Sequence, residues 1–517
     1  MTQPADRVFV NAEVHTLADP DSTADPADPD RAGRHADEVH EAVAVRDGRV
    51  VRVDSEYEVE FLAGVETDVV DCDGGVLLPG FVDAHTHMEV VGRRLVHADL
   101  GAADDREEAI ELLEEAPGEE WVLGYGYDES TWPSGAYLTR EELDSVADNR
   151  PVVAFREDLH TASVSSVVLE RYGEELPENG VERADGEPTG VVREDAAEFL
   201  RTETAPGREE TRELVAAARD FAHERGVTGV HDMVRHSDAP AAYRELAVDD
   251  ELDLRVRLYY WADHLDAVEE TGLVTNHGGE FLEVGGIKTY TDGSLGAGTA
   301  KLAESYADRE GTGEWVVPPA ELADVVERVE DLGMQLAVHA IGDEAVATAL
   351  GALPDDPSMR HRIEHAELLP GEPSELDGVV ASMQPNFLRW AGKGGLYEDR
   401  LGAERTAASN RFADILEAGV PLAFGSDCMP LDPLYGVQQT VTAPEPSQRL
   451  GVTEALRAYT LGAAYAGHAE DRFGTVEPGK RADFVVLAES PWAVDDDAIA
   501  DIDVAMTVVD GEVVHEA

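Results

Sequence analysis

The chain has 517 residues, too many for one ordinary core but suited to a single large α/β barrel with attached pieces or to several domains. Hydrophobic residues make up 43% of it, so a sizeable core is available and wholesale disorder is excluded. The 40 Lys and Arg against 109 Asp and Glu give a formal net charge of -69. Such a charge repels nucleic acid phosphates and anionic lipid headgroups, so we expect neither kind of partner.

The acidic residues are spread along the whole chain, and only four of the 40 cations are lysines. Self-repulsion of this size works against the compact state unless salt screens it, as it does at 1 M, where the Debye length is ~3 Å. The composition resembles that of cytoplasmic proteins from salt-accumulating halophiles and favours a halophilic archaeon as the source. An unusually acidic mesophilic protein is the alternative.

The two cysteines and the lack of long apolar segments indicate the cellular compartment in which we expect the protein. Cys72 and Cys428 lie far apart without a partner pattern, which excludes a disulfide framework and a zinc site made of cysteines only. The first thirty residues lack a basic start followed by an apolar run, and no later segment approaches ~18 uninterrupted apolar residues. We therefore expect a soluble, cytoplasmic protein.

Both ends of the chain are rich in short strand patterns. At the N-terminus the runs 7–17 and 41–54 read as strands, and the acidic stretch 19–40 between them reads as an exposed loop. At the C-terminus the runs 482–489 and 504–516 have the same character. We predict a small β-sandwich domain composed of residues 1–79 and 468–517.

The middle of the chain alternates apolar runs with amphipathic stretches. The runs are 227–233, 254–261, 281–290, 334–342, 360–368, 379–387 and 420–427. Together with the segment GFVDAHTH they predict about eight parallel βαβ units, closed into a (β/α)8 TIM barrel over 80–467. The interval 99–222 breaks this rhythm, and we interpret it as an α+β insertion after the first barrel strand.

Several candidate metal ligands follow predicted barrel strands. His85 and His87 are two residues apart, so alternation along a strand points both imidazoles the same way. His339, His365 and Asp427 each come at the C-terminal end of another predicted strand, and these ends converge on one face of a barrel. A single such histidine is more often a hydrogen-bonded core residue. The set as a whole predicts a site for zinc or a similar divalent metal.

The same residues lie within a series of ordered motifs. These are PGFVDAHTH (79–87), GGIKTYTDGSLGAGTA (285–300), AVHAIGDEA (337–345), HRIEHAEL (361–368), GSDCMP (425–430) and FGTVEPGKRADFVVL (473–487). In them the chain resembles the amidohydrolase superfamily, specifically the YtcJ-like metal-dependent hydrolases of the amidohydrolase 3 type. The resemblance extends into the insertion through GYGYDESTW, RPVVAFREDLH and PTGVVREDA.

The resemblance implies a two-metal centre, with two zinc ions per chain. One ion would be held by His85, His87, an N-carboxylated Lys288 and Asp427, and the second by the same lysine with His339 and His365. Asp427 would act as base and then as acid, while a metal-bound hydroxide attacks the carbonyl of an amide, formamide or cyclic amide. From the residues alone, an ammonium of Lys288 that snorkels or pairs with Asp292 stays open.

We make predictions for four further residues. By resemblance, His160 would bind the substrate's carbonyl or leaving group, with a surface histidine as the alternative. Trp132 would line the pocket, with an aromatic ring packed under a loop as the alternative. Asp343 would cap the helix that follows it. We expect strand alternation to turn Cys428 away from the metal.

The residues are also compatible with two other functions. One is a mononuclear-metal deaminase or an ester or lactone hydrolase, in which Lys288 stays free. The other is a non-catalytic regulatory homologue, which predicts a missing ligand, and none is missing. The partner we expect is a small-molecule substrate, with a homodimer as the oligomer the family often forms. The fold does not identify the substrate, because substrate specificity depends on loops and insertions.

Overall fold

The computed structural model describes residues 3–18, 39–116, 118, 120–354 and 356–517. The chain divides into two compact units. The first contains Met1–His87, Asp220–His236 and Arg244–Ala517, and the second contains Met88–Arg219 and Ser237–Tyr243. The acidic stretch 19–40, expected to be a loop, lies outside the described residues except for β3 (Val39–His40).

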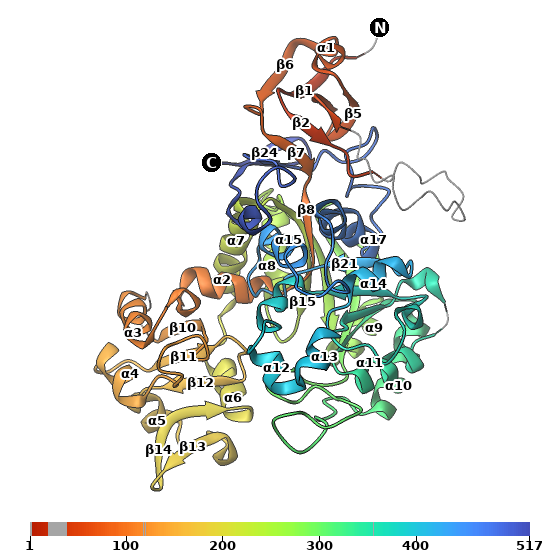
Figure 1. Cartoon of the computed structure of the whole chain (residues 1–517). Coiled ribbons are helices and arrows are strands. Elements are labelled where there is room, and N and C mark those ends of the chain that lie inside the picture. The colour runs from red at the N-terminus through yellow and green to blue at the C-terminus, as the bar shows by residue number, and fades with distance from the viewer. Residues whose placement is uncertain (1–2, 19–38, 117, 119, 355) are drawn as a thin grey trace. The chain divides into compact units, whose positions relative to one another are not determined.

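The first unit contains eight parallel strands that follow one another around a barrel (Figure 1). In order they are β8 (Phe81–Thr86), β15 (Val227–Val234), β16 (Arg255–Trp261), β17 (Leu282–Tyr290), β18 (Gln335–Ala340), β19 (Arg362–His365), β20 (Val380–Met383) and β21 (Leu422–Phe424). The segment after β21 returns to β8, because the Asp427 amide donates to the His85 carbonyl at 2.7 Å. The predicted barrel is thus confirmed.

The barrel strands are short apolar runs that are covered on both sides. All eight residues of β15 are buried, as are the four of β19, which is the pattern of parallel strands enclosed by helices. The helices of this unit are α1 (Glu56–Glu60), α9 (Leu265–Thr271), α10 (Pro319–Leu332), α11 (Asp343–Ala352), α12 (Leu396–Leu401), α13 (Ala403–Ala407), α14 (Phe412–Glu417), α15 (Pro433–Val441), α16 (Val452–Arg457) and α17 (Ala463–Ala466). Helix α10 is an example of their amphipathic pattern. It buries Leu322, Val326 and Val329 on one stripe, and its C-cap is Gly333 in a left-handed conformation.

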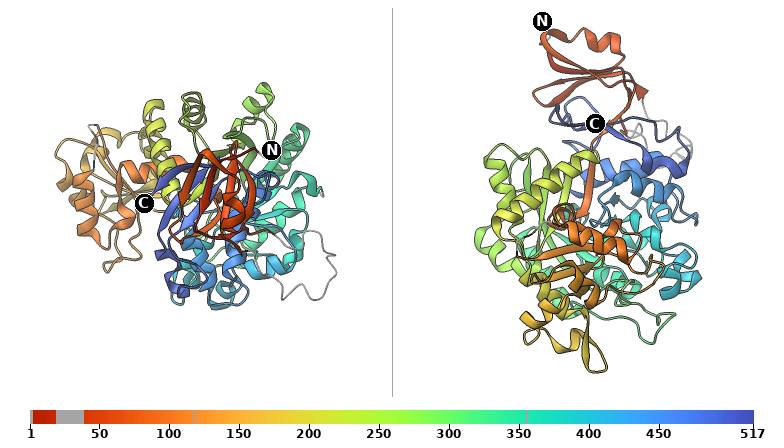
Figure 2. Two further views of the ribbon diagram at one scale, coloured as in Figure 1. Left: turned by 90° about the horizontal axis from the view of Figure 1, so that it is seen from above. Right: turned by 90° about the vertical axis from the view of Figure 1, so that its left-hand side faces the viewer.

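Strands from both ends of the chain form two further sheets. The first has the order β5-β4-β1-β6 and the second the order β24-β23-β22-β7-β2-β3. Their bounds are β1 (Ala5–Val10), β2 (Glu13–His15), β4 (Ala42–Arg46), β5 (Arg49–Asp54), β6 (Ala63–Asp71), β7 (Val76–Pro79), β22 (Phe484–Leu487), β23 (Val504–Val509) and β24 (Glu512–Glu516). Phe9 of β1 packs edge-on against Phe484 of β22 at 5.5 Å, so the sheets share one core. Figure 2 shows the red N-terminal strands beside the blue C-terminal ones.

The second unit has its own mixed sheet, in the order β13-β14-β12-β11-β10-β9. The strands are β9 (Ala98–Asp99), β10 (Val122–Tyr127), β11 (Val152–Arg156), β12 (Thr161–Val164), β13 (Val181–Ala184) and β14 (Glu187–Arg193). The helices are α2 (Met88–Val96), α3 (Arg106–Glu115), α4 (Arg140–Val146), α5 (Ser166–Tyr172) and α6 (Asp195–Glu203), whereas α7 (Arg208–Glu224) and α8 (Ala239–Val248) are each divided between the two units. An α+β unit therefore interrupts the barrel after its first strand, which agrees with the predicted fold.

The described part of the chain contains no candidate for a membrane-spanning helix. Its helices lack the length and the apolar character that crossing a bilayer requires.

Candidate metal centre

Six side chains of the first unit meet at the C-terminal ends of the barrel strands. They are His85 of β8, His87 just after it, Lys288 of β17, His339 of β18, His365 at the end of β19 and Asp427 after β21. Strands that run parallel bring these ends to one rim, so residues far apart in sequence become neighbours.

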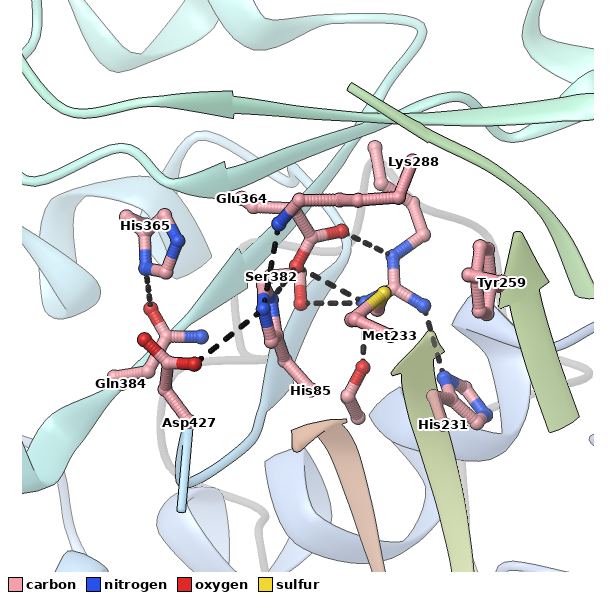
Figure 3. Close-up of polar contacts among 12 residues, drawn as sticks. His85, His231, Met233, Tyr259, Lys288, Glu364, His365, Ser382, Gln384 and Asp427 are labelled. Carbon is pink, nitrogen blue, oxygen red and sulfur yellow. Dashed lines mark hydrogen bonds and ion pairs between the residues drawn. The ribbon is translucent and has the colours of Figure 1, made fainter. Parts of the chain in front are cut away.

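Three of the six already form a compact group. One ligand atom each of His85, His87 and Asp427 lies within 4.8 Å of the others. Asp427 Oδ1 is 3.2 Å from His87 Nε2 and 3.7 Å from His85 Nε2. Lys288 Nζ approaches the same His85 nitrogen at 3.3 Å, so His85 interacts with both Lys288 and Asp427 (Figure 3).

The remaining two imidazoles lie against this group. The ring of His365 is 4.9 Å from that of His85 and 4.5 Å from that of His339, measured between centroids. The structure therefore brings all six predicted ligands together at one place.

Each imidazole uses one ring nitrogen to contact an acceptor of the protein. The contacts are His85 Nδ1 with Glu364 Oε2 at 2.5 Å, His87 Nδ1 with the Met233 carbonyl at 2.8 Å, His365 Nδ1 with Gln384 Oε1 at 2.7 Å, and His339 Nε2 with the Gly293 carbonyl at 3.1 Å. Because carboxylate and carbonyl oxygens only accept, the bonded nitrogen carries the proton. In His85, His339 and His365, whose rings are neutral, the other nitrogen then has a lone pair, which is the arrangement of a metal-ligating histidine.

Burial also keeps most of these rings neutral. It lowers the pKa of His85 and His339 well below the usual value and that of His365 to about 3. Burial opposes a proton on His87 as well, but the hydrogen bond with the Asp427 carboxylate raises its pKa overall. Burial would raise the pKa of Asp427, yet His87 and His85 hold it well below its ordinary range. A cation at this point would replace the proton that His87 shares with Asp427.

Lys288 has no carboxylate partner of the kind that the sequence left open. Its side chain is buried, and this burial lowers the pKa of the amine to about 8. Asp292 instead accepts backbone amides of Lys301 at 2.7 Å, Ile341 at 3.1 Å and Gly342 at 2.9 Å. The pairing of Lys288 with Asp292 is therefore not observed, and Asp292 fixes the loops beside the site.

Backbone strain accompanies the site. His365, Asp427 and Cys428 have φ values of 73°, 50° and 57°, a left-handed region that residues other than glycine seldom adopt. In a regular strand Glu364 and His365 would point to opposite faces, but both reach His85 here. Strand alternation does not apply to Cys428 as expected, because β21 ends at Phe424 and the residue lies in this left-handed segment.

The two candidates from the insertion lie in the second unit. The side chain of His160 is 57% exposed, and its Nδ1 is 3.2 Å from Glu194 Oε2. Trp132 is only 4% exposed, and its indole nitrogen donates to the Ala103 carbonyl at 2.9 Å. Its ring belongs to the hydrophobic core of that unit, an observation that favours the packing alternative over a pocket wall.

Asp343 has a structural part in the first unit. It begins α11, and its Oδ1 accepts the amides of Ala303 at 2.9 Å and Glu344 at 3.1 Å. The carboxylate therefore ties the start of the helix to the loop after β17.

Sequence reasoning missed the residues that hold the ligands, chiefly Glu364, Gln384 and Arg362. A signal was present in HRIEH, since alternation places Arg362 and Glu364 on one face of a strand. Charged residues on a strand enclosed on both sides must face each other or a site.

Comparison with known proteins identifies the family of this chain. The family model described as the amidohydrolase family matches residues 68–515. The chain belongs to the amidohydrolase family. YtcJ of Bacillus subtilis strain 168, a protein named as an amidohydrolase, is 31% identical over 513 residues, which cover 92% of this chain and 96% of YtcJ. Membership in this family supports a divalent metal cofactor and a small-molecule substrate.

Two more similar proteins match this chain over nearly its full length. The N-substituted formamide deformylase of Arthrobacter pascens is 26% identical over 558 residues, covering 100% of this chain and 99% of the deformylase. The crystal structure of a metal-dependent hydrolase from Pyrococcus furiosus superposes with a TM-score of 0.76 at 29% identity, covering 94% of this chain and 99% of the other.

Proposed function

We propose that this amidohydrolase cleaves a carbon–nitrogen bond other than a peptide bond, in an amide, a formamide or a cyclic amide. The observation that carries the proposal is the cluster of four imidazoles at the ends of the barrel strands, two of them buried and two half-buried, each with one ring nitrogen in contact with an acceptor of the protein. A carboxylate and a buried lysine complete the set.

We propose that this donor set holds two divalent ions, and that they are zinc because nitrogen ligands predominate. His85, His87, Lys288 and Asp427 would hold the first ion, and Lys288, His339 and His365 the second. When bound, such ions lower the pKa of water and polarise a carbonyl oxygen.

Two metals need a bridging anion, and Lys288 can become one by carboxylation. Its neutral amine attacks the carbon of carbon dioxide, an N–C bond forms, and one proton leaves to solvent. The product is a carbamate with two oxygens and one negative charge. Burial supports this step because it lowers the pKa of the amine to about 8.

Asp427 is the group we propose for proton transfer. It is ionised, it lies 3.2 Å from His87, and its left-handed backbone turns it towards the histidines. The carboxylate would accept the proton of the attacking water and deliver it to the departing nitrogen, as base and then as acid.

The formamide class is supported by the likeness to the formamide deformylase over the whole chain. From the insertion we retain His160 as a substrate-binding residue, since its exposed ring is accessible to a ligand.

The test is a screen of N-formyl, N-acyl and cyclic amide compounds with metal-reconstituted protein in molar potassium chloride. We expect hydrolysis of at least one of these classes, its loss on dialysis against a chelator, and its return with zinc. Two metals per chain and a mass gain of one carboxyl group on Lys288 should accompany it.

Other outcomes would replace the proposal. Hydrolysis confined to carboxylic esters would refute the substrate class. One metal with an unmodified lysine would favour the mononuclear alternative.

A further inference from the structure

A buried ion pair lies inside the barrel beneath the candidate metal centre. Arg362 and Glu364 of β19 both have side chains that are 0% exposed, and Arg362 Nε is 2.7 Å from Glu364 Oε1. Taking two charges out of water costs more than their attraction returns unless further hydrogen bonds fix them. Such a pair therefore adds little to stability by itself. Its role follows from the other contacts of Arg362 and Glu364.

Arg362 binds groups on several strands at once. Its guanidinium donates to the Ala84 carbonyl of β8 at 2.5 Å, to His231 Nδ1 of β15 at 2.9 Å and to Ser382 Oγ of β20 at 2.8 Å. It also lies over the ring of Tyr259 of β16, 4.8 Å from the centroid. Burial keeps the pKa of His231 well below its usual value, so that ring is neutral and can accept. These contacts leave the guanidinium a single orientation.

Glu364 transmits that orientation to the metal site. Its Oε2 accepts from Arg362 Nη2 at 3.1 Å and contacts His85 Nδ1 at 2.5 Å. Figure 3 shows Glu364 beside His85. A carboxylate on Nδ1 fixes the tautomer of an imidazole and makes Nε2 a more basic ligand. His85 Nε2 is the atom that faces both Lys288 and Asp427.

We propose that Arg362 and Glu364 are positioning residues, which hold His85 so that its Nε2 points into the metal centre. The inference rests on the proposed function, since it gives the pair a role in holding the metal. Neither residue touches the reacting atoms; Arg362 fixes Glu364, and Glu364 fixes His85.

The experiment measures zinc affinity rather than turnover, using the full chain in molar potassium chloride and competition with a chromophoric chelator. Glu364→Gln keeps the shape of the side chain and removes its charge. We expect its zinc dissociation constant to rise about 10–100-fold over wild type, the range found when such partners are lost. Arg362→Lys, which loses the forked contacts, should shift it in the same direction.

A matched control separates positioning from stability. Arg255 and Asp483 form another buried pair, with contacts at 2.6 and 2.8 Å and side chains 7% and 3% exposed, but neither contacts a candidate ligand in the described structure. Asp483→Asn should lower the thermal unfolding midpoint while zinc affinity stays at the wild-type value.

Two results would overturn the inference. Glu364→Gln that folds and binds zinc as tightly as wild type would remove the positioning role alone. So would Asp483→Asn losing as much zinc affinity as Glu364→Gln. If wild-type protein binds no divalent ion, the proposed function fails together with the inference.

Discussion

At the scale of single residues, Asp427 has two neighbours that define its chemistry, His87 and His85. If it transfers the proton, Asp427→Asn should lower kcat on the order of 10²–10⁴-fold in steady-state assays. Asp432 of the same loop is the control, because its Oδ1 caps α15 through the Tyr435 amide at 3.0 Å. Asp432→Asn should leave kcat unchanged, and an equal loss in both variants would argue against the assigned role.

Lys288 gives a pH-dependent expectation. Burial lowers the pKa of its amine to about 8, so the neutral fraction rises as pH rises through that value. Only the neutral amine takes up carbon dioxide. At fixed dissolved carbon dioxide, metal-free protein should therefore carry more carboxyl adduct at about pH 9 than at about pH 6, as intact mass spectrometry can measure. Lys288→Met should show no such gain; a gain that ignores pH would contradict the expectation.

Glu367 should make the stability of the folded protein fall as pH rises. Burial raises its pKa to about 8, so the folded state keeps a proton that the unfolded chain has lost above about pH 4.3. Stability therefore falls as pH rises between these values, by at most about 1.4 kcal/mol per pH unit. Glu367→Gln should remove this loss in denaturant titrations of metal-free protein at about pH 5 and pH 8. An unchanged slope against pH would show that the group ionises freely.

At the scale of elements, the closure of the barrel depends on Gly425. A Cβ at this position would lie 2.3 Å from the His85 amide nitrogen, between the end of β21 and β8. Gly425→Ala should therefore push β8 away, weaken zinc binding, and lower the free energy of unfolding by roughly 1–3 kcal/mol. Gly351 of α11 meets open space, and Gly351→Ala should be neutral or stabilising by up to about 1 kcal/mol. Normal zinc binding by Gly425→Ala would contradict the tight closure.

The elements also show where sequence patterns carry information. Alternation with period two predicted that His85 and His87 point the same way, and both approach Asp427 although β8 ends at Thr86. The ends of the parallel strands brought six distant residues to one rim. The pattern failed where the backbone leaves the regular strand. Left-handed residues at His365 and Cys428 change the direction of the chain, and no periodicity in the residues signals them.

At the scale of the whole molecule, the net charge of -69 remains the dominant property. Repulsion among exposed carboxylates is screened over ~3 Å at 1 M salt but over ~10 Å at 0.1 M. The thermal unfolding midpoint should therefore rise with potassium chloride and fall on dialysis into dilute buffer. A neutral osmolyte serves as the control, because it leaves charges unscreened. Equal stability in dilute and molar salt would contradict the halophilic interpretation.

The sequence by itself determined the barrel, the strand-rich ends and the types of residue at the strand ends, because these follow from local periodicity and from motifs. Only the tertiary structure decided which atoms contact each imidazole, and that Trp132 packs in the core of its own unit. It also decided that Asp292 accepts backbone amides of the neighbouring loops and does not pair with Lys288. Those outcomes depend on the register between strands and on strained backbone. Contacts across a barrel also join residues that are hundreds of positions apart in sequence, and no local sequence pattern encodes the distance between such residues.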